Sequence, residues 1–234
     1  MSTQTSDSLL STLGLTLQGS LHTDTVMKTL YATDASAYRE MPLGVAIPET
    51  KEDLEKIILF ADQHSIPLIP RTAGTSLAGQ VVGKALVVDV SKFFNRILEI
   101  NKEESYVWVE PGVVRDVLNV ELKKQGLFFG PETSTANRAM IGGMMGNNAC
   151  GSNSIIYGST RDHVLEVDGF LSDGSPVHFK AEDPFETIKS LKKGTRLHGI
   201  YEKTQKTIYN AYMHHTYMRD VSAVTAGHRF VIFL

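Results

Sequence analysis

The sequence has little cysteine and no excess of positive charge, and both shortages narrow the range of functions. Cys150 is the single cysteine among 234 residues. An internal disulfide and a cysteine-rich zinc or iron–sulfur site are therefore excluded, and a reducing, intracellular compartment is expected. With 23 basic and 26 acidic residues, and a formal net charge of -3, the sequence lacks the basic surface that nucleic acid binding requires.

Long apolar runs are also missing. No window approaches the roughly 18 consecutive apolar residues of a membrane-spanning helix. Residues 1–20 are rich in Ser and Thr, without the cationic and apolar regions of a secretory signal. We therefore expect a cytoplasmic protein, whose association with the inner membrane would be peripheral and made through a partner.

Two glycine-rich stretches stand out, one over residues 70–79 and one over residues 141–152. Glycine tolerates positive φ and has no Cβ, so such segments expose backbone N–H groups that phosphate can approach. Asn147, Asn148 and Ser152 add amide and hydroxyl groups to the second stretch. Asx turns that satisfy their own backbone are the alternative interpretation. Neither stretch has the spacing of a P-loop or of a Rossmann dinucleotide site.

Hydrophobic spacing predicts helices and strands in alternation around these stretches. Thr50 and Asp53 form a capping-box-like start, followed by a helix as far as His64. Trp108 is expected in the core. Strands are predicted at 68–70 and 85–90, and a second helix at 113–122. Two hairpins are predicted, one pairing 97–100 with 106–110 and one pairing 164–171 with 176–179. Two C-terminal helices are predicted after 181 and after 198. Between the two hairpins, residues 130–159 are expected to form a long Gly/Asn/Ser-rich loop, and a loop of that length usually either carries function or is disordered. Its glycines and asparagines favour function.

The order and wording of six segments resemble one family. They are Leu30 to Ser36, Pro70 to Gly79, Val109 to Gly112, Gly130 to Thr135, Ile141 to Gly151, and Tyr157 with Gly158. Together they resemble the FAD-linked oxidases of the vanillyl-alcohol-oxidase, or PCMH-type, fold. Within that group the resemblance is closest to the FAD-dependent D-lactate and D-2-hydroxyacid dehydrogenases. It implies an α+β fold, a PCMH-type FAD-binding domain made of two α/β subdomains with FAD between them.

The resemblance also implies which residues hold the cofactor. Backbone N–H groups and hydroxyls of the first stretch would wrap the FAD diphosphate, through Arg71, Thr72, Ala73, Gly74, Thr75, Ser76 and Leu77. Diphosphate, ribityl chain and one flavin edge would lie along Pro131, Ser134, Thr135, Gly142, Gly143, Asn147, Asn148, Ala149, Gly151 and Ser152. The backbone near Val167 would border the adenine. No metal site and no catalytic residue is assigned.

Several single residues receive a structural interpretation. No histidine lies between Arg71 and Gly79, where some relatives attach flavin covalently, so FAD is expected to bind non-covalently. Cys150 is interpreted as a small buried residue rather than a reactive thiol. Arg71 is expected to order its loop, and Asp162 to cap the following strand. His214 and His215 are interpreted as solvated side chains, because neighbours on a helix diverge and no third ligand joins them.

The predicted organisation is an N-terminal extension over 1–37, a PCMH-type FAD-binding domain over 38–218, and an irregular, truncated tail over 219–234, with the substrate domain absent. The complete enzyme would oxidise a D-2-hydroxyacid to the 2-oxoacid and pass electrons to a quinone, cytochrome or iron–sulfur partner. The chain alone would be incomplete for catalysis. A stand-alone flavin-binding subunit completed by another polypeptide, or a non-catalytic fragment, are the alternatives.

Overall fold

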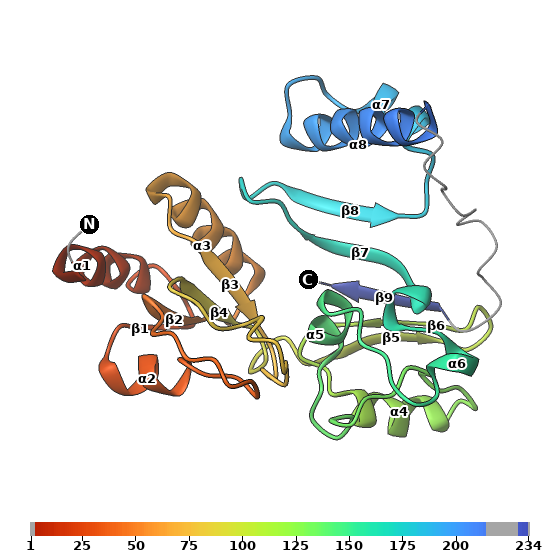
Figure 1. Cartoon of the computed structure of the whole chain (residues 1–234), viewed down its shortest axis with the longest axis horizontal. Coiled ribbons are helices and arrows are strands. Elements are labelled where there is room, and N and C mark those ends of the chain that lie inside the picture. The colour runs from red at the N-terminus through yellow and green to blue at the C-terminus, as the bar shows by residue number, and fades with distance from the viewer. Residues whose placement is uncertain (1–2, 214–228, 234) are drawn as a thin grey trace.

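The computed structural model describes residues 3–213 and 229–233, which form two lobes, each built on its own β-sheet (Figure 1). The first lobe contains, in chain order, α1 (Thr3–Gly14), β1 (Ser20–His22), α2 (Thr25–Leu30), β2 (Gly44–Ile47), α3 (Lys51–His64), β3 (Leu68–Arg71) and β4 (Leu86–Asp89). Its strand order is β1-β2-β4-β3. β1 runs antiparallel to β2, whereas β2 and β3 both run parallel to β4.

Helix α3 forms where the capping box predicts it. The Thr50 hydroxyl accepts a hydrogen bond from Asp53 N at 3.2 Å, and Ser65 ends the helix in the left-handed region at φ 53°. Leu54, Ile57 and Ala61 are buried on one face. This face packs on the first sheet, in a core to which Leu10 and Leu13 of α1 also belong.

The second lobe contains β5 (Ile97–Asn101), β6 (Tyr106–Val109), α4 (Arg115–Lys123), α5 (Ile141–Gly146), α6 (Ser154–Tyr157), the 3-10 turn η1 (Thr160–His163), β7 (Val164–Phe170), β8 (Pro176–Lys180), α7 (Pro184–Ser190), α8 (Arg196–Met213) and β9 (Arg229–Phe233). Its sheet has the order β5-β6-β9-β7-β8. β5-β6 and β7-β8 are the two antiparallel hairpins that alternation predicts.

Strand β9 arises where the sequence pattern predicts no element. It lies between β6 and β7 and runs parallel to both, with Val107 in register with Phe230 and Val167 with Ile232. A continuous apolar run without alternation is what a central strand flanked by parallel neighbours requires. Only residues 230–233 of this strand are apolar, and so short a run without alternation does not identify a strand from the sequence. His214 and His215, which the sequence indicates to be solvated side chains, lie outside the described residues.

Trp108 departs from its expected place in the core. Its neighbours Val107 and Val109 are buried, with 1% and 0% of their surfaces exposed, whereas Trp108 is half-buried. Alternation along β6 directs the two valines into the core that α4 and α5 cover, so Trp108 lies on the opposite face. The prediction was wrong because the size of an aromatic side chain does not say which face of a strand is covered.

The two lobes touch through the β7-β8 hairpin, which reaches toward α3 (Figure 1). Phe170 packs partly against the core of the first lobe. Gly174 in the turn has φ +78°, and a Cβ added there would lie 2.7 Å from Leu59 Cδ2 on α3. Glycine therefore permits both the turn and its close approach to the helix.

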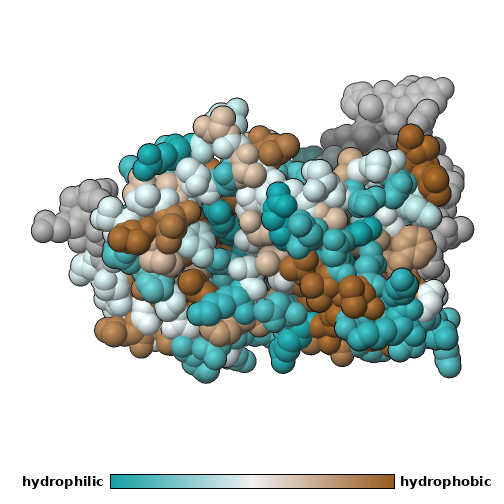
Figure 2. Space-filling view, turned by 90° about the horizontal axis from the view of Figure 1, so that it is seen from below, coloured by the Kyte–Doolittle hydropathy of each residue, from teal (hydrophilic) through white to brown (hydrophobic). Residues whose placement is uncertain are grey.

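The outer surface is mixed. Figure 2 shows exposed hydrophobic groups gathered in separate patches among hydrophilic ones on the face seen from below. Scattered apolar side chains are normal on a protein surface. Among the described helices, none combines the length and the apolar character needed to cross a bilayer.

Candidate functional site

The first glycine loop, residues 71–79, leaves the end of β3 and leads toward β4. Gly74 and Gly79 have φ of +64° and +70°, which L-residues with a side chain rarely adopt. A Cβ on Gly74 would lie 2.6 Å from Arg71 Nη2, and one on Gly79 would lie 2.7 Å from Tyr38 Cδ2. Both glycines are therefore favoured by their conformation, and a side chain at either position would displace the Arg71 guanidinium or the Tyr38 ring.

Backbone donors of this loop are unused. Within the described residues, none of the N–H groups of residues 72–77 donates a hydrogen bond, although Ala78 N donates to the Ser76 hydroxyl at 3.1 Å. Most backbone N–H groups in a folded protein have a partner. A run of successive free donors in a turn is a concave surface suited to an anion.

The loop is held from below by residues of the Leu30 to Ser36 segment. Arg71 Nη1 donates to Thr33 O at 2.9 Å, and Ala35 N donates to Gly74 O at 3.2 Å. The Arg71 guanidinium lies over the Tyr31 ring, 5.1 Å from its centroid. Arg71 thus orders its loop, as the sequence predicts.

The second glycine loop, residues 130–135 together with 141–152, is anchored by buried apolar residues. Ile141, Met144 and Ala149 enter the core of the second lobe. Ile141 N donates to Val113 O, and Gly142 N to Pro111 O, both at 2.9 Å. A Cβ on Gly151 would lie 1.7 Å from Glu132 O, so only glycine lets the two halves of this loop meet.

The two loops come into contact. A Cβ on Gly143 would lie 2.6 Å from Thr72 Oγ1. The Ser76 hydroxyl donates to Gln80 Oε1 at 2.7 Å, and Gln80 Nε2 donates to Asn147 Oδ1 at 2.8 Å. These contacts join segments far apart in the sequence, since Gln80 and Asn147 are separated by 67 positions. The structure therefore brings together the two stretches singled out from the sequence.

Both asparagines present donors to the space beside the loops. Asn147 Oδ1 accepts from Gln80, and Asn148 Oδ1 accepts from Arg161 N at 3.0 Å. Because each side-chain oxygen is engaged, each amide NH₂ group remains to donate, and neither donates within the described residues. The backbone N–H groups of residues 132–135 and of Gly143 are likewise unengaged among these residues. The site therefore offers a neutral donor surface, which suits an acceptor-rich ligand.

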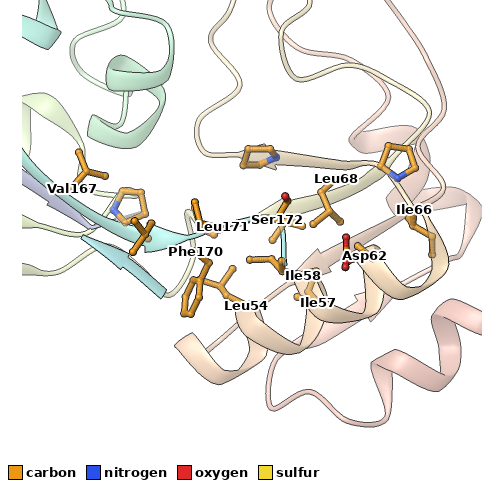
Figure 3. A pocket seen from close by; sticks show the side chains of 18 of the residues that line it. Leu54, Ile57, Ile58, Asp62, Ile66, Leu68, Val167, Phe170, Leu171 and Ser172 are labelled. Carbon is orange, nitrogen blue, oxygen red and sulfur yellow. The ribbon is translucent and has the colours of Figure 1, made fainter. Parts of the chain in front are cut away.

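A cavity of about 1040 Å³ lies between the lobes, bounded by α3 and β3 on one side and by β7 and β8 on the other (Figure 3). Its lining is mostly apolar, with Leu54 and Ile57 contributed by α3 and Val167 and Phe170 by β7. Pro70, which precedes the first glycine loop, and Met145, which belongs to the second, also line it. Its volume suits a large ligand with an apolar portion.

The residues predicted to hold the cofactor lie in the two glycine loops and in the lining of the cavity. Val167 lines the cavity. The first loop carries Arg71 to Leu77, and Gly143 and Asn147 lie on the part of the second loop that meets it. Pro131, Gly142 and Ala149 are buried, and Pro131 O accepts from Arg115 Nε at 3.1 Å. The remaining members lie along the second loop, with exposed or half-buried side chains where they have one: Ser134, Thr135, Asn148, Gly151 and Ser152.

Cys150 and Asp162 depart from their predicted roles. Cys150 is exposed rather than buried, because Ala149 takes the adjacent core position. Asp162 closes a capping box on η1, one element before the strand, by accepting from Ser159 N at 2.7 Å and from the Ser159 hydroxyl at 2.8 Å. These bonds lower the pKa of Asp162.

Three residues that the sequence does not single out also matter here. Tyr31 and Asp89 lie beneath the first loop, where the Tyr31 hydroxyl donates to Asp89 Oδ2 at 2.5 Å. Burial, followed by the bond to Asp89, raises the pKa of Tyr31. Gln80 bridges the loops. Tyr31 stands in a segment that carries the family resemblance, but only the fold shows what these side chains contact.

Comparison with known proteins gives a consistent picture. A family model described as "FAD binding domain" matches residues 42–180. The sequence is 42% identical over 164 residues to a D-2-hydroxyglutarate dehydrogenase from Pseudomonas putida, covering 69% of this chain and 16% of that protein. It is 33% identical over 191 residues to "D-lactate dehydrogenase [cytochrome], mitochondrial" from Kluyveromyces lactis, covering 80% of this chain and 31% of that protein. The chain thus spans a minor part of these relatives.

Among solved structures, p-cresol methylhydroxylase superposes with a TM-score of 0.60 at 17% sequence identity, over 75% of this chain and 34% of that one. This similarity concerns the fold alone. The predicted PCMH-type α+β fold is confirmed, and so is the resemblance carried by the six sequence segments.

Proposed function

Because the chain belongs to the FAD binding domain family, we propose that it binds FAD non-covalently between its two lobes, as the cofactor-binding part of an oxidoreductase that oxidises a D-2-hydroxyacid. The observation that carries this proposal is the contact between two donor-rich loops beside an apolar cavity. Sequence identity of 42% to a D-2-hydroxyglutarate dehydrogenase supports the substrate class.

The donor surface fits the diphosphate of FAD. Free N–H groups over residues 72–77 on one side, and the Asn147 and Asn148 amides on the other, would meet a double anion with neutral dipoles. Neutral donors fixed in place stabilise charge without a flexible cation having to be ordered. The Thr75 hydroxyl would add to the first side, whereas the Ser76 hydroxyl already donates its proton to Gln80 Oε1. Arg71 supplies the positive charge of the first loop, and its guanidinium lies beside Gly74.

The cavity fits the adenine end. A purine needs a largely apolar slot with a few polar groups at its edge. Val167 and Pro70 line the cavity beside the two loops, and β7 places the Val167 backbone there. We assign this end of the cavity to adenine. The absence of histidine over residues 72–79 supports non-covalent attachment.

When bound, FAD supplies the capacity to accept a hydride from the carbon that bears the substrate hydroxyl. The residues described above bind and orient the cofactor and exclude water from its adenine end. We assign no residue of this chain to the base that takes the hydroxyl proton or to the cation that holds the substrate carboxylate. In the complete enzyme, electrons would then pass to a quinone, cytochrome or iron–sulfur acceptor, in the cytoplasm or at the inner membrane through that partner. We keep residues 38–218 as the proposed FAD-binding unit.

The visible spectrum of the purified chain after desalting and FAD addition tests this proposal. We expect flavin absorbance near one equivalent, and release of all flavin into the supernatant on acid precipitation. A colourless chain that takes up no FAD would refute cofactor binding, and flavin that stays with the precipitate would refute non-covalent attachment. Anaerobic D-2-hydroxyglutarate or D-lactate should not bleach the flavin of this chain. Bleaching would show that the chain carries the missing groups.

A further inference from the structure

A buried acid and a cation lie side by side beneath the first glycine loop without forming an ion pair. Arg71 ends β3 and Asp89 ends β4, and the two are in register on these parallel strands. Register partners on adjacent strands direct their side chains to the same face of the sheet. Asp89 has only 7% of its surface exposed. Such a carboxylate would ordinarily attract the neighbouring guanidinium strongly.

Within the part of the chain that the structure describes, Arg71 nevertheless makes no ion pair with a carboxylate. Its Nη1 donates instead to Thr33 O at 2.9 Å. The guanidinium turns toward the first glycine loop, where a Cβ on Gly74 would lie 2.6 Å from Nη2. The positive charge is therefore held against the loop and away from the acid.

Tyr31 accounts for this arrangement, because it contacts both Asp89 and Arg71. Its hydroxyl donates to Asp89 Oδ2 at 2.5 Å, while Ser91 N donates to Asp89 Oδ1 at 2.8 Å, so each carboxylate oxygen has a donor. The face of its ring meets the guanidinium at 5.1 Å. An aromatic face attracts a cation without neutralising its charge. Tyr31 thus separates two opposite charges that would otherwise combine.

We propose that Tyr31 is a positioning residue, which keeps Arg71 from pairing with Asp89 so that the guanidinium stays against the first glycine loop and attracts the diphosphate of FAD. This inference rests on the proposed function, because the loop has a diphosphate to attract only if FAD binds there. Tyr31 itself need not touch the cofactor. It acts through Arg71, and its hydroxyl is the atom that matters.

Removal of that hydroxyl is the direct test. In Tyr31→Phe, Asp89 Oδ2 loses its donor and draws Arg71 toward itself. The dissociation constant of FAD, measured by quenching of flavin fluorescence on titration with the whole chain, should rise about tenfold, as expected when one interaction with a charged group is lost. The dependence of that constant on salt concentration should also become shallower, because Arg71 no longer contributes its charge.

Rescue separates this role from simple packing. Asp89→Asn in the Tyr31→Phe background removes the competing charge, so Arg71 should return to the loop, with FAD affinity recovering several-fold. A ring that merely fills space would show no such rescue. Tyr106→Phe is the matched control, because the Tyr106 hydroxyl donates to Glu99 Oε1 at 2.7 Å on the hairpin of the second lobe. Its FAD affinity and salt dependence should equal those of the unmodified chain.

Arg71→Gln provides a second measurement. It should weaken FAD binding and flatten the salt dependence, and adding Tyr31→Phe to it should have no further effect. Unchanged affinity and salt dependence in Tyr31→Phe, or additive effects of the two substitutions, would overturn the inference. If Tyr31→Phe does not fold, the double variant Tyr31→Phe with Asp89→Asn decides the matter. A double variant that neither folds nor binds FAD would also overturn the inference. Failure of the unmodified chain to bind FAD would instead refute the proposed function.

Discussion

The two glycine loops reach the same place in the molecule by different means. The second is fixed by the hydrophobic core, since Ile141, Met144 and Ala149 are buried beside it. Polar and charged contacts hold the first, through Arg71, Thr33 and the pair formed by Tyr31 and Asp89. Changes in the second loop should therefore lower the free energy of unfolding of its lobe, whereas the first loop can be changed while its lobe stays folded.

The largest effect is expected from Gly151→Ala in the second loop. The new Cβ would lie 1.7 Å from Glu132 O, a backbone atom that cannot move without displacing the loop. We expect a loss of roughly 3 kcal/mol or more in the free energy of unfolding, measured by urea denaturation. Gly146→Ala is the control, because nothing lies within 4 Å of a Cβ there and the residue is helical. Equal stability of both variants would mean that the second loop is not fixed by close packing.

A smaller loss of stability should follow from Asp53→Asn at the start of α3. Burial alone would raise the pKa of Asp53, but backbone N–H groups of Glu49, Gln18 and Gly19 donate to the carboxylate and lower it on balance. Bonds of this kind to a charged acceptor contribute about 1 to 3 kcal/mol.

The sign of the pH dependence follows from the lowered pKa of Asp53. Its stabilising contribution is complete above the pKa of the unfolded chain and is lost as pH falls through the lower folded value. Asp53→Asn should therefore reduce the unfolding free energy at neutral pH and have little effect at strongly acid pH. Denaturation curves over this range give the measurement. A deficit that is constant with pH would show that the carboxylate charge plays no part.

Gly74→Ala should weaken cofactor binding more than it weakens the fold. Positive φ costs roughly 1 to 2 kcal/mol for alanine, and the Cβ would also displace the Arg71 guanidinium. Gly126→Ala is a matched control, with φ +75° and nothing within 4 Å of a Cβ. Both should lose similar stability, but only Gly74→Ala should lose FAD affinity, as titration of flavin fluorescence would show. Equal affinities would place the diphosphate elsewhere.

Gln80→Ala should have the smallest effect. It removes the exposed bridge from Ser76 to Asn147, so the loops separate and Asn147 loses the contact that orients its amide. We expect FAD affinity to fall about threefold, since exposed hydrogen bonds contribute on the order of 0.5 to 1 kcal/mol. Gln63→Ala, an exposed position on α3, should bind FAD as the unmodified chain does. Identical affinities of the two variants would contradict a role for the bridge.

Local patterns predict much of the fold and the general location of the site. The Thr50 cap and the two hairpins are confirmed as elements and the first glycine stretch as a loop, because each depends on neighbours in sequence. The second glycine stretch is predicted to be a loop throughout, but helix α5 (Ile141–Gly146) forms its first half. Contacts between distant segments are not accessible in this way. The bond from Tyr31 to Asp89 joins positions 58 residues apart, and the outward position of Cys150 depends on which neighbour fills the core. The assignment of individual residues to the cofactor stays a prediction.

The place of β9 in the second sheet has a consequence for how the chain folds. Every strand of the first sheet lies before Val90, so that sheet can be completed early during synthesis. The second sheet cannot close until Arg229–Phe233 has been made and has entered between β6 and β7. Until then, the facing edges of β6 and β7 offer unpaired backbone groups to other chains. Folding in the cell would thus proceed from the first lobe to the second, with the second exposed to mispairing until its central strand arrives.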